Sequence, residues 1–335
     1  MNRLVLPVIA VLLVLAIPGC AAEKTEGGGG SHKKDKFNII LDYFPNADHA
    51  GIYAAQAAGD YDRAGLDVDI KPPPDPSAPL KLLRTGQADV VISYEPELLL
   101  ARDKGSDLVS VGALVQKPLT TLMTLDGSIH SPADLAGKRV GTAGIPYQTA
   151  YLQTILRRAR VPSSSVKETN VGSSLLPAML SGKVDATLGG FWNVEGVELR
   201  SRGAKPWIEP VDKLGVPDYD ELVLVANADK LDGERDDLRL FISAVARGAS
   251  EARRDPAGAS RALLDANRDL KRKETTESVR LTIPTLFPKS GRPWGYLDPV
   301  SWQNYGGWMV SNGVLKKLPN VDAALTNKLL PGQGL

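Results

Sequence analysis

A short unit that occurs twice is the feature that most constrains the fold of this chain. In each copy a helical segment ends at a glycine, an aspartate follows three residues later, and an apolar strand begins; the copies are Leu82–Asp89 and Met179–Asp185. Glycine is typical after a helix end because it adopts the left-handed backbone conformation without strain. Both predicted strands then run into a loop of aromatic and polar residues. The repeated unit predicts two similar α/β lobes.

Around this unit, strand-like and helix-like segments alternate at short intervals. We predict strands at residues 37–41, 66–70, 89–93, 138–142, 184–188 and 222–226, and helices at 50–58, 80–83, 98–102, 147–158, 176–182 and 238–249. Aspartate followed by proline predicts further helix starts at Asp255 and Asp298. Because single helices separate most of the strands, we expect the fold class to be α/β with mainly parallel sheets.

The predicted elements divide between two lobes. We expect the first lobe to comprise residues 37–116 together with 222–335, and the second lobe residues 117–221. The strand at 222–226 returns to the first sheet in this scheme. The chain then crosses between the lobes twice, and two crossings can serve as a hinge.

The N-terminus predicts an export signal over residues 1–20. A short basic start is followed by 14 apolar residues, Leu4–Ile17, whereas a membrane-spanning helix needs about 20. The segment Ile17–Cys20 resembles a bacterial lipobox, so we expect lipidation of Cys20. Pro18 departs from the small residue usual in that motif, and a failure of processing there would release a soluble secreted protein instead.

Residues 21–36 predict a flexible tether between the anchor and a globular body, because they include four consecutive glycines and lack large apolar side chains. The expected location is therefore extracytoplasmic, at the bacterial cell membrane. Of the 40 Lys and Arg residues, Arg3 is removed with the signal, which leaves as many as the 39 Asp and Glu residues. A neutral body gives no electrostatic reason to expect a nucleic-acid partner.

Enzyme and metal signatures are missing from the sequence. The chain has one cysteine and three scattered histidines, which argues against an internal disulfide, a cysteine-based metal cage and a zinc site. It contains no G-x-S-x-G elbow, phosphate-binding loop or H-E-x-x-H motif. We therefore expect a protein that is not an enzyme and that holds neither a metal nor a cofactor.

Aromatic and polar side chains gather where three predicted strands end. Ligands of open α/β sheets bind beyond the carboxyl ends of strands, and pockets favour the space between domains. A flat heteroaromatic ligand needs faces on which to stack, which Tyr43, Tyr94 and Trp192 could supply. Polar contacts at its rim, with carboxylates suited to amino groups, could come from Asp42, Asn46, His49, Ser93, Glu95, Asn193 and Glu195.

Each of these candidates also has a purely structural alternative. We expect Phe44 and Phe191 to be core residues rather than ligand contacts. Asn46 also fits a simple turn, Asn193 a helix N-cap, and Glu195 a solvated position on a helix. Their convergence on three strand ends is what favours a binding site.

A fourth candidate lies in the turn Gly141–Tyr147, which follows a predicted strand and precedes a helix. Backbone N–H groups at such a turn can bind an anionic or carbonyl group. Its candidate residues are Thr142, Gly144 and Tyr147. Many strand-to-helix turns have this pattern without binding anything.

The same segments carry a resemblance to a known family. The matching segments are Leu41–Gln56, Asp75–Leu83, Ile92–Pro96, Leu99–Gly105, Gly112–Gln116 and Phe191–Gly196. They resemble the thiamine-precursor-binding (ThiY-like) periplasmic proteins, and the resemblance spans roughly residues 37–318. Close relatives in this group are thought to bind riboflavin, and more distant ones sulfonates or nitrate.

The resemblance implies a type II periplasmic binding protein with a ligand cleft between its lobes. Such a protein delivers its ligand to the permease of an ABC importer, and we expect it to act as a monomer. The implied ligand is a thiamine pyrimidine precursor of the formylaminopyrimidine or hydroxymethylpyrimidine type. Whether this ligand is phosphorylated, and which permease is served, stay open.

Two alternatives accompany this interpretation. The first is a flavin receptor of the same class, which would need a wider cleft. The second is a pyrimidine synthase, since eukaryotic cousins make the pyrimidine from pyridoxal phosphate and their own histidine. That branch carries a cysteine-rich motif, whereas the only cysteine here is Cys20, outside the body.

Overall fold

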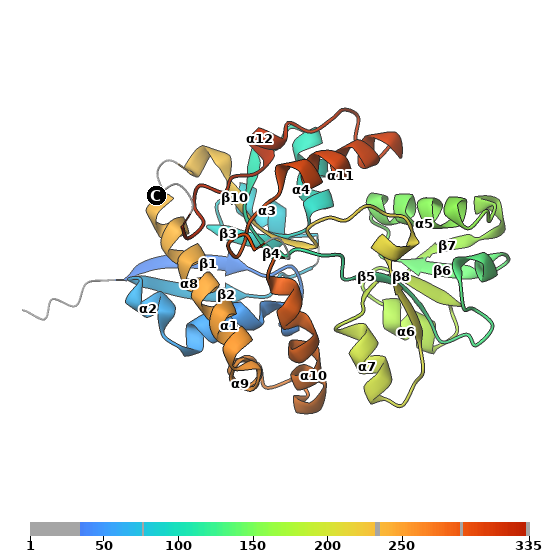
Figure 1. The fold of residues 1–335 in the computed structure, drawn as a ribbon, viewed down its shortest axis with the longest axis horizontal. Coiled ribbons are helices and arrows are strands. Elements are labelled where there is room, and N and C mark those ends of the chain that lie inside the picture. Colours follow the sequence, from blue (N-terminus) through green and yellow to red (C-terminus); the bar gives the residue numbers. More distant parts are fainter. Residues whose placement is uncertain (1–33, 76, 232–234, 289–290, 333–335) are drawn as a thin grey trace, which may run out of the picture. The chain divides into compact units, whose positions relative to one another are not determined.

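Two separate five-stranded sheets organise the chain, with the orders β2-β1-β3-β10-β4 and β7-β6-β8-β5-β9. The first contains β1 (Asp35–Ile40), β2 (Leu66–Lys71), β3 (Val90–Ser93), β4 (Leu108–Val115) and β10 (Leu222–Asn227). The second contains β5 (Thr120–Thr124), β6 (Arg139–Thr142), β7 (Lys167–Asn170), β8 (Ala186–Phe191) and β9 (Trp207–Pro210). Each sheet forms the centre of one lobe (Figure 1).

The computed structural model describes residues 34–335 except 76, 232–234, 289–290 and 333–335. The predicted signal peptide, Cys20 and residues 21–33 of the predicted tether lie outside the described residues. Strand β1 begins within the range expected for the tether, because Asp35 and Lys36 already pair with Leu66 and Asp67.

The sheets are mixed, so the expectation of mainly parallel sheets was wrong. Four of the eight strand pairings are parallel, within the β1, β2, β3 and β6, β7, β8 groups. The other four are antiparallel and involve β10 and β5. A parallel neighbour needs a crossover such as a helix, but β4 continues directly into β5 in the other lobe. β5 and β10 are the first strands after the two crossings, and each runs antiparallel to both of its neighbours.

Helices cover both sheets. The first lobe carries the short 3₁₀ helix η1 (Ala47–His49), α1 (Ala50–Ala57), α2 (Asp60–Arg63), α3 (Pro79–Arg84), α4 (Glu95–Asp103), α8 (Arg235–Arg254), α9 (Pro256–Ala266), α10 (Arg272–Thr282), α11 (Pro299–Ser311) and α12 (Val321–Ala324). The second carries α5 (Pro146–Arg158), α6 (Leu175–Leu180) and α7 (Glu195–Ser201). Asp255 and Asp298 cap α9 and α11 by accepting from the N–H groups of Gly258 and Val300, as predicted.

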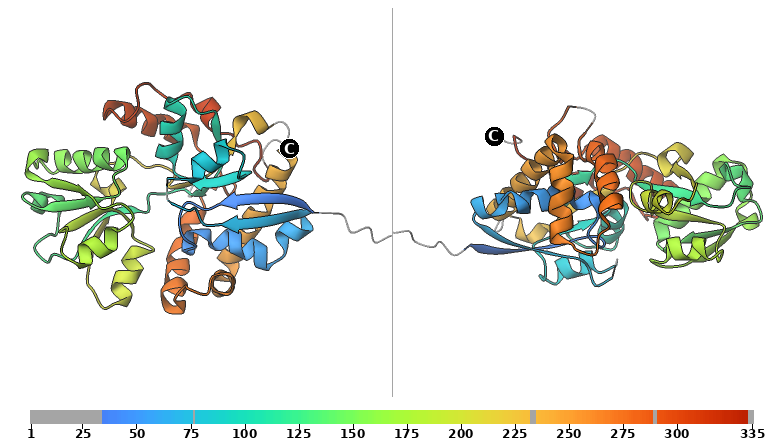
Figure 2. Two further views of the ribbon diagram at one scale, coloured as in Figure 1. Left: turned by 180° about the vertical axis from the view of Figure 1, so that it is seen from behind. Right: turned by 90° about the horizontal axis from the view of Figure 1, so that it is seen from below.

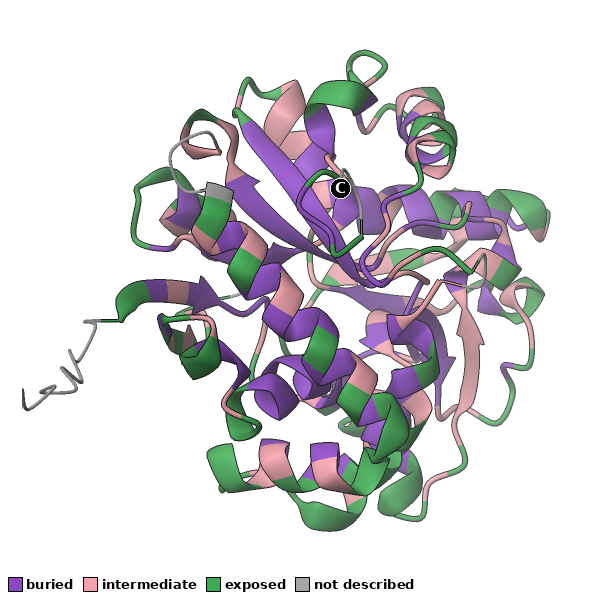
Figure 3. Cartoon of the chain, turned by 60° about the vertical axis from the view of Figure 1, so that its left-hand side comes forward, coloured by how far each residue is buried: buried purple, intermediate pink, exposed green. Residues whose placement is uncertain are grey.

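Helices α1 and α8 pack closely because small residues line their contact. A Cβ atom on Gly248 would collide with the carbonyl oxygen of Gly51 and with Ala55, and one on Gly51 would lie 3.2 Å from Ala249. The blue α1 and orange α8 lie side by side in Figures 1 and 2. Figure 3 shows that the strands are mostly buried, while the outer faces of the helices are exposed. None of the described helices is long and apolar enough to span a membrane.

A buried carboxylate ties the two lobe crossings together. Glu221, just before β10, accepts hydrogen bonds through Oε2 from the N–H groups of Leu119 (2.6 Å) and Thr120 (2.9 Å). The hydroxyls of Thr120 and Tyr219 donate to the same carboxylate at 3.0 and 2.9 Å. Because Leu119 and Thr120 belong to the first crossing and Glu221 to the second, this carboxylate links the two hinge segments.

Candidate functional site

The residues after β1 form a hydrogen-bonded group inside the first lobe. The carboxylate of Asp42 is bonded through Oδ1 to His49 Nε2 and through Oδ2 to the hydroxyl of Tyr94, both at 2.8 Å. His49 accepts from the N–H of Asn46 through Nδ1 at 3.1 Å, so its proton is on Nε2 and is donated to Asp42. Asp42 and His49 are buried. His49 therefore orients Asp42 rather than meeting a ligand through its own edge.

Asn46 caps a helix rather than forming the simple turn that was its structural alternative. Its side-chain oxygen accepts from the N–H of Asp48 at 2.8 Å, and its nitrogen donates to the carbonyl of Phe44. It caps η1, which places Asp48 and His49 at the start of α1.

Tyr43 and Phe44 project from the same turn in different environments. Tyr43 is half-buried, and its pKa is raised by burial and by the charges of Glu195 and Asp42. Glu195 belongs to the second lobe, so Tyr43 lies close enough to that lobe for the charge of Glu195 to oppose ionisation of the phenol. Phe44 is 66% exposed, so the expectation that it is a core residue was wrong: its ring meets only the edge of Tyr43 among the described aromatic contacts, at a centroid distance of 5.1 Å.

The segment after β3 points partly toward the hinge. Glu95 is fully buried and accepts from the N–H of Asp220 at 2.8 Å, while its Oε1 has no partner. Burial and the charge of Asp220 raise the pKa of Glu95 well above its ordinary value. Ser93 donates to Glu97 at 3.1 Å, and burial raises the pKa of Glu97 to about 7. The hydroxyl of Ser93 and one carboxylate oxygen of Glu95 are thus hydrogen-bonded within the protein.

In the second lobe, the loop after β8 supplies three candidates. Trp192 is half-buried and donates from Nε1 to the carbonyl of Pro118, at the first crossing. Glu195, the first residue of α7, accepts from the N–H of Phe191 at 2.7 Å, and burial raises its pKa. Phe191 packs against the apolar core. Trp192 and Glu195 are each anchored by a hydrogen bond between the side chain and the backbone, and Trp192 also packs against a buried apolar cluster.

Asn193, in the same loop, reaches across to the first lobe. Its Nδ2 donates to Asp48 Oδ1 and to Thr282 Oγ1, both at 2.6 Å. Ser201 of α7 also donates to Glu274 of α10 at 2.7 Å. On the opposite side, the hydroxyls of Tyr151 in α5 and Tyr305 in α11 are 2.5 Å apart. Contacts on both sides therefore hold the lobes together in this structure.

The turn after β6 is not assembled as an anion site. Thr142 donates to Glu168 at 2.9 Å, the N–H of Ala143 donates to Gln148, and the side chain of Asn170 lies directly against Gly144. The Thr142 hydroxyl and the Ala143 N–H are thus engaged within the second lobe. Ligand contacts from Thr142 and Gly144 stay a prediction.

Tyr147 differs from its neighbours in that turn. It is buried, and burial together with the charges of Glu97, Glu221 and Asp42 raises its pKa well above the ordinary value. Two of these carboxylates belong to the first lobe and the third to the hinge, so the charges that act on Tyr147 lie outside its own lobe.

Sequence reasoning missed several residues that meet here, namely Asp48, Glu97, Asp220, Glu221 and Thr282. Asp48 and Glu97 lie within three residues of predicted candidates, so their proximity was a usable signal. Asp220 and Glu221 lie in the aromatic-polar segment Asp218–Glu221, which was a usable signal because it directly precedes a predicted strand. Thr282 comes from a segment without such a pattern, and only the fold brings it close.

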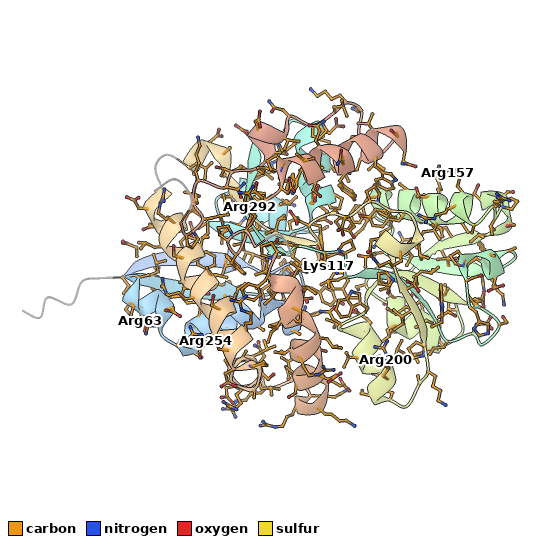
Figure 4. All side chains as sticks on the ribbon, in the orientation of Figure 1. Arg63, Lys117, Arg157, Arg200, Arg254 and Arg292 are labelled. Atoms are coloured by element: carbon orange, nitrogen blue, oxygen red, sulfur yellow. The ribbon has the colours of Figure 1, made fainter. Side chains whose placement is uncertain are left out.

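The lobe contact is rich in carboxylates. Asp48, Glu95, Glu97, Glu195 and Glu221 all have raised pKa values, caused first by burial. Two basic residues, Lys117 on the first crossing and Arg200 on α7, are labelled among the side chains in Figure 4. Where the chain is described, no three or more His, Cys, Asp or Glu side chains are placed to hold a metal ion.

Comparison with known proteins identifies the family. A family described as NMT1/THI5 like matches residues 46–259. The chain belongs to the NMT1/THI5-like family. A formylaminopyrimidine-binding protein of Halalkalibacterium halodurans is 33% identical to it over 92% of this chain and 94% of its own length. A 4-amino-5-hydroxymethyl-2-methylpyrimidine phosphate synthase of Uromyces fabae is 28% identical over 67% of this chain and 69% of its own.

A solved structure shows the same fold. The periplasmic aliphatic sulphonate binding protein SsuA of Escherichia coli superimposes with a TM-score of 0.68 at 15% identity, covering 89% of this chain and 93% of SsuA. This confirms the expected two-lobed periplasmic binding fold. The resemblance to the thiamine-precursor group is also confirmed, by the family match and the formylaminopyrimidine-binding relative.

Proposed function

We propose that this member of the NMT1/THI5-like family is an extracytoplasmic solute-binding protein of an ABC importer. Its ligand is a thiamine pyrimidine precursor of the formylaminopyrimidine or hydroxymethylpyrimidine type. The observation that carries the ligand class is the 33% identity, over nearly the full length of both chains, to a formylaminopyrimidine-binding protein.

The lobe contact has the chemistry that such a ligand needs. Tyr43 from the first lobe and Trp192 from the second are half-buried aromatic side chains on which a planar ring can stack. Asp42 and Glu195 are carboxylates that suit the amino group of a pyrimidine. Asp42 is held in position by His49 and Tyr94, which lowers the entropy that ligand binding would otherwise cost.

Ligand contacts contributed by both lobes favour closure. A ligand shifts a conformational equilibrium only as far as it binds one state better than the other. Tyr43 and Glu195 come from opposite lobes, so a ring held between them makes its full set of contacts only when the lobes are together. The closed form is then the form presented to the permease. In this proposal Cys20 carries the lipid anchor and the receptor acts as a monomer.

A binding screen tests the ligand class. The purified body, residues 34–335, is titrated with formylaminopyrimidine, hydroxymethylpyrimidine, thiamine, riboflavin and taurine, while tryptophan fluorescence and the unfolding midpoint are recorded. We expect a pyrimidine precursor to raise the midpoint with concentration, at a Kd of about 1 nM to 1 μM. Binding of riboflavin or taurine without the pyrimidines would overturn the proposed ligand.

The tryptophan that reports binding locates the site. The chain has five tryptophans, and we expect Trp192→Phe to abolish most of the ligand-induced fluorescence change. Trp207→Phe, on β9 of the same lobe, is the matched control and should leave the change intact. Loss of the signal in the control but not in Trp192→Phe would place the ligand elsewhere.

The synthase of Uromyces fabae makes an enzyme the second candidate. The sequence weighs against it, since its only cysteine is Cys20, and both ring nitrogens of His49 are bonded inside the protein. Incubation with pyridoxal phosphate and iron should yield no pyrimidine. Formation of product, with loss of His49 detected by mass spectrometry, would replace the receptor by the synthase.

A further inference from the structure

Two buried acceptor atoms at the lobe contact have no hydrogen-bond donor. They are Oδ2 of Asp48 and Oδ1 of Asn193, and both residues are 0% exposed. A buried polar atom without a partner is costly, so native structures keep few of them. These two atoms belong to side chains that are already bonded to each other, from Asn193 Nδ2 to Asp48 Oδ1 at 2.6 Å.

The orientation of the Asn193 amide is fixed by its neighbours. Thr282 donates its hydroxyl proton to the carbonyl of Ser278 at 2.8 Å, so toward Asn193 it acts only as an acceptor. Nδ2 therefore has to face both Thr282 Oγ1 and Asp48 Oδ1. Turning the amide round would place its oxygen against two acceptors and would not remove the problem.

A single proton on Asp48 Oδ2 gives both unpartnered atoms a hydrogen bond, because Oδ2 becomes the donor and Asn193 Oδ1 the acceptor. A protonated carboxyl group donates through its hydroxyl and accepts through its other oxygen. Asp48 in this form accepts from Asn193 through Oδ1 and donates from Oδ2 to Asn193 Oδ1. The two side chains then form a paired acid and amide across the lobe contact, with no need for another molecule.

The charges around Asp48 favour the protonated form. The carboxylates of Asp42, Glu195 and Glu221 all act on it, from the segment after β1, from α7 and from the hinge. Helix α10, which packs against η1, contributes the neutral Thr282, whose hydroxyl accepts from Asn193. His49, next in the chain, is bonded to Asp42. Burial, followed by Asp42, raises the pKa of Asp48 well above its ordinary value, against the hydrogen bond from Asn193.

We propose that Asp48 is a positioning residue for ligand binding, which holds Asn193 against the first lobe as a protonated acid. Through Asn193 it places the loop that carries Trp192 and Glu195. The inference rests on the proposed function in one respect, because those two side chains are the proposed ligand contacts of the second lobe.

The expected pH dependence follows from the proton. When the lobes open, Asp48 meets water and its pKa returns toward the ordinary value, about 4; when they close, the pKa is raised. The contribution to closure is therefore complete below the open-state value and is lost as the pH rises through the closed-state value. Between these limits, affinity should fall by up to tenfold per pH unit.

Asp48→Asn provides the decisive comparison, because an asparagine supplies the same donor and acceptor without a proton. Formylaminopyrimidine is titrated calorimetrically against the parent body, Asp48→Asn, Asp48→Ala and Thr282→Val from pH 5.5 to 8.5. We expect the ratio of the parent's Kd to that of Asp48→Asn to rise at least tenfold across this range. Titration of the free ligand affects both proteins alike and cancels in the ratio.

The other two variants separate protonation from simple contact. Asp48→Ala should bind at least tenfold more weakly than Asp48→Asn at every pH. Thr282→Val removes one acceptor of Asn193 and should weaken binding equally at all pH values, with the slope of the parent. A constant Kd ratio between the parent and Asp48→Asn, or weaker binding by Asp48→Asn at every pH, would overturn the inference; the latter result would mean that Oδ2 accepts from ligand or water.

A measurement without ligand keeps this inference distinct from the proposed function. The unfolding midpoints of the ligand-free parent and Asp48→Asn are compared from pH 5.5 to 8.5. The parent should lose stability relative to Asp48→Asn as the pH rises. If that difference is present but no pyrimidine binds, the proposed ligand is wrong and the protonated form of Asp48 stands. Equal pH profiles of the two proteins would refute the protonation of Asp48.

Discussion

Asp42 and Glu195 are both carboxylates of the candidate site, but they differ in the hydrogen bonds that hold them. Asp42 receives hydrogen bonds from His49 and Tyr94, and both donors belong to its own lobe. Glu195 receives one, from the N–H of Phe191, and is not fully buried. A carboxylate with remaining acceptor capacity at the edge of its lobe can bind a donor that arrives with the other lobe or with a ligand.

At the residue scale, we expect Glu195→Ala to weaken binding of a pyrimidine precursor at least tenfold, about 1.4 kcal/mol. The reason is the loss of an acceptor for its amino group. Calorimetric titration measures the change, and circular dichroism checks that the fold is retained. Glu198→Ala is the matched control one turn along α7, where Glu198 is ion-paired with Arg202. If Glu195→Ala binds as tightly as the parent, this carboxylate is not part of the site.

At the scale of single elements, close packing of helices decides where small residues are required. Helix α8 crosses α1 at Gly248, where an added Cβ would collide with the backbone carbonyl of Gly51. A backbone atom cannot move aside as the end of a flexible side chain can. The contact also matters for the site, because α1 follows directly on η1, which carries Asp48 and His49.

We expect Gly248→Ala to lower the free energy of unfolding by about 1–3 kcal/mol, through overpacking. Urea denaturation measures the change. Gly127→Ala is the control, since nothing lies within 4 Å of its added Cβ; it should be neutral or slightly stabilising, because alanine restricts the unfolded chain. Equal stability of the two variants would show that α1 and α8 can separate without cost.

At the scale of the whole molecule, buried carboxylates collect where the two lobes and the hinge meet. Burial raises the pKa values of Glu97, Asp220 and Glu221 each to about 7. Glu221 accepts four hydrogen bonds from the two crossings, and these bonds favour its charged form against the effect of burial. Raising the pH adds charge to this region.

We therefore expect the ligand-free protein to lose thermal stability between pH 5 and pH 8. The folded-state pKa values lie above the unfolded values of about 4 to 4.5, so the stabilising contribution is complete below the unfolded values and is lost as the pH rises through about 7. Calorimetry of the body in a pH series measures the effect. Glu97→Gln should make the decline shallower; an unfolding midpoint that rises across this range would contradict the prediction.

Local sequence determined a large part of the fold. The strands β1, β2, β3, β6, β8 and β10 and most of the longer helices lie close to their predicted positions, because apolar periodicity, helix-ending glycines and the caps at Asp255 and Asp298 act over a few residues. The predicted ends of β1, β3 and β8 also carry the candidate site. Four strands, β4, β5, β7 and β9, were missed. The expected boundaries of the lobes at 116/117 and 221/222 stay predictions.

Only the tertiary structure decided which side chains meet. The sequence shows that Asn193 and Asp48 are both polar, but not that Asn193 donates to Asp48 across 145 positions. It also does not show that Glu221 accepts from the N–H groups of Leu119 and Thr120. It placed Phe44 in the core, whereas the side chain is exposed. Periodicity reports the face a residue takes on its own element, whereas hydrogen bonding and burial at a site depend on how separate elements pack together.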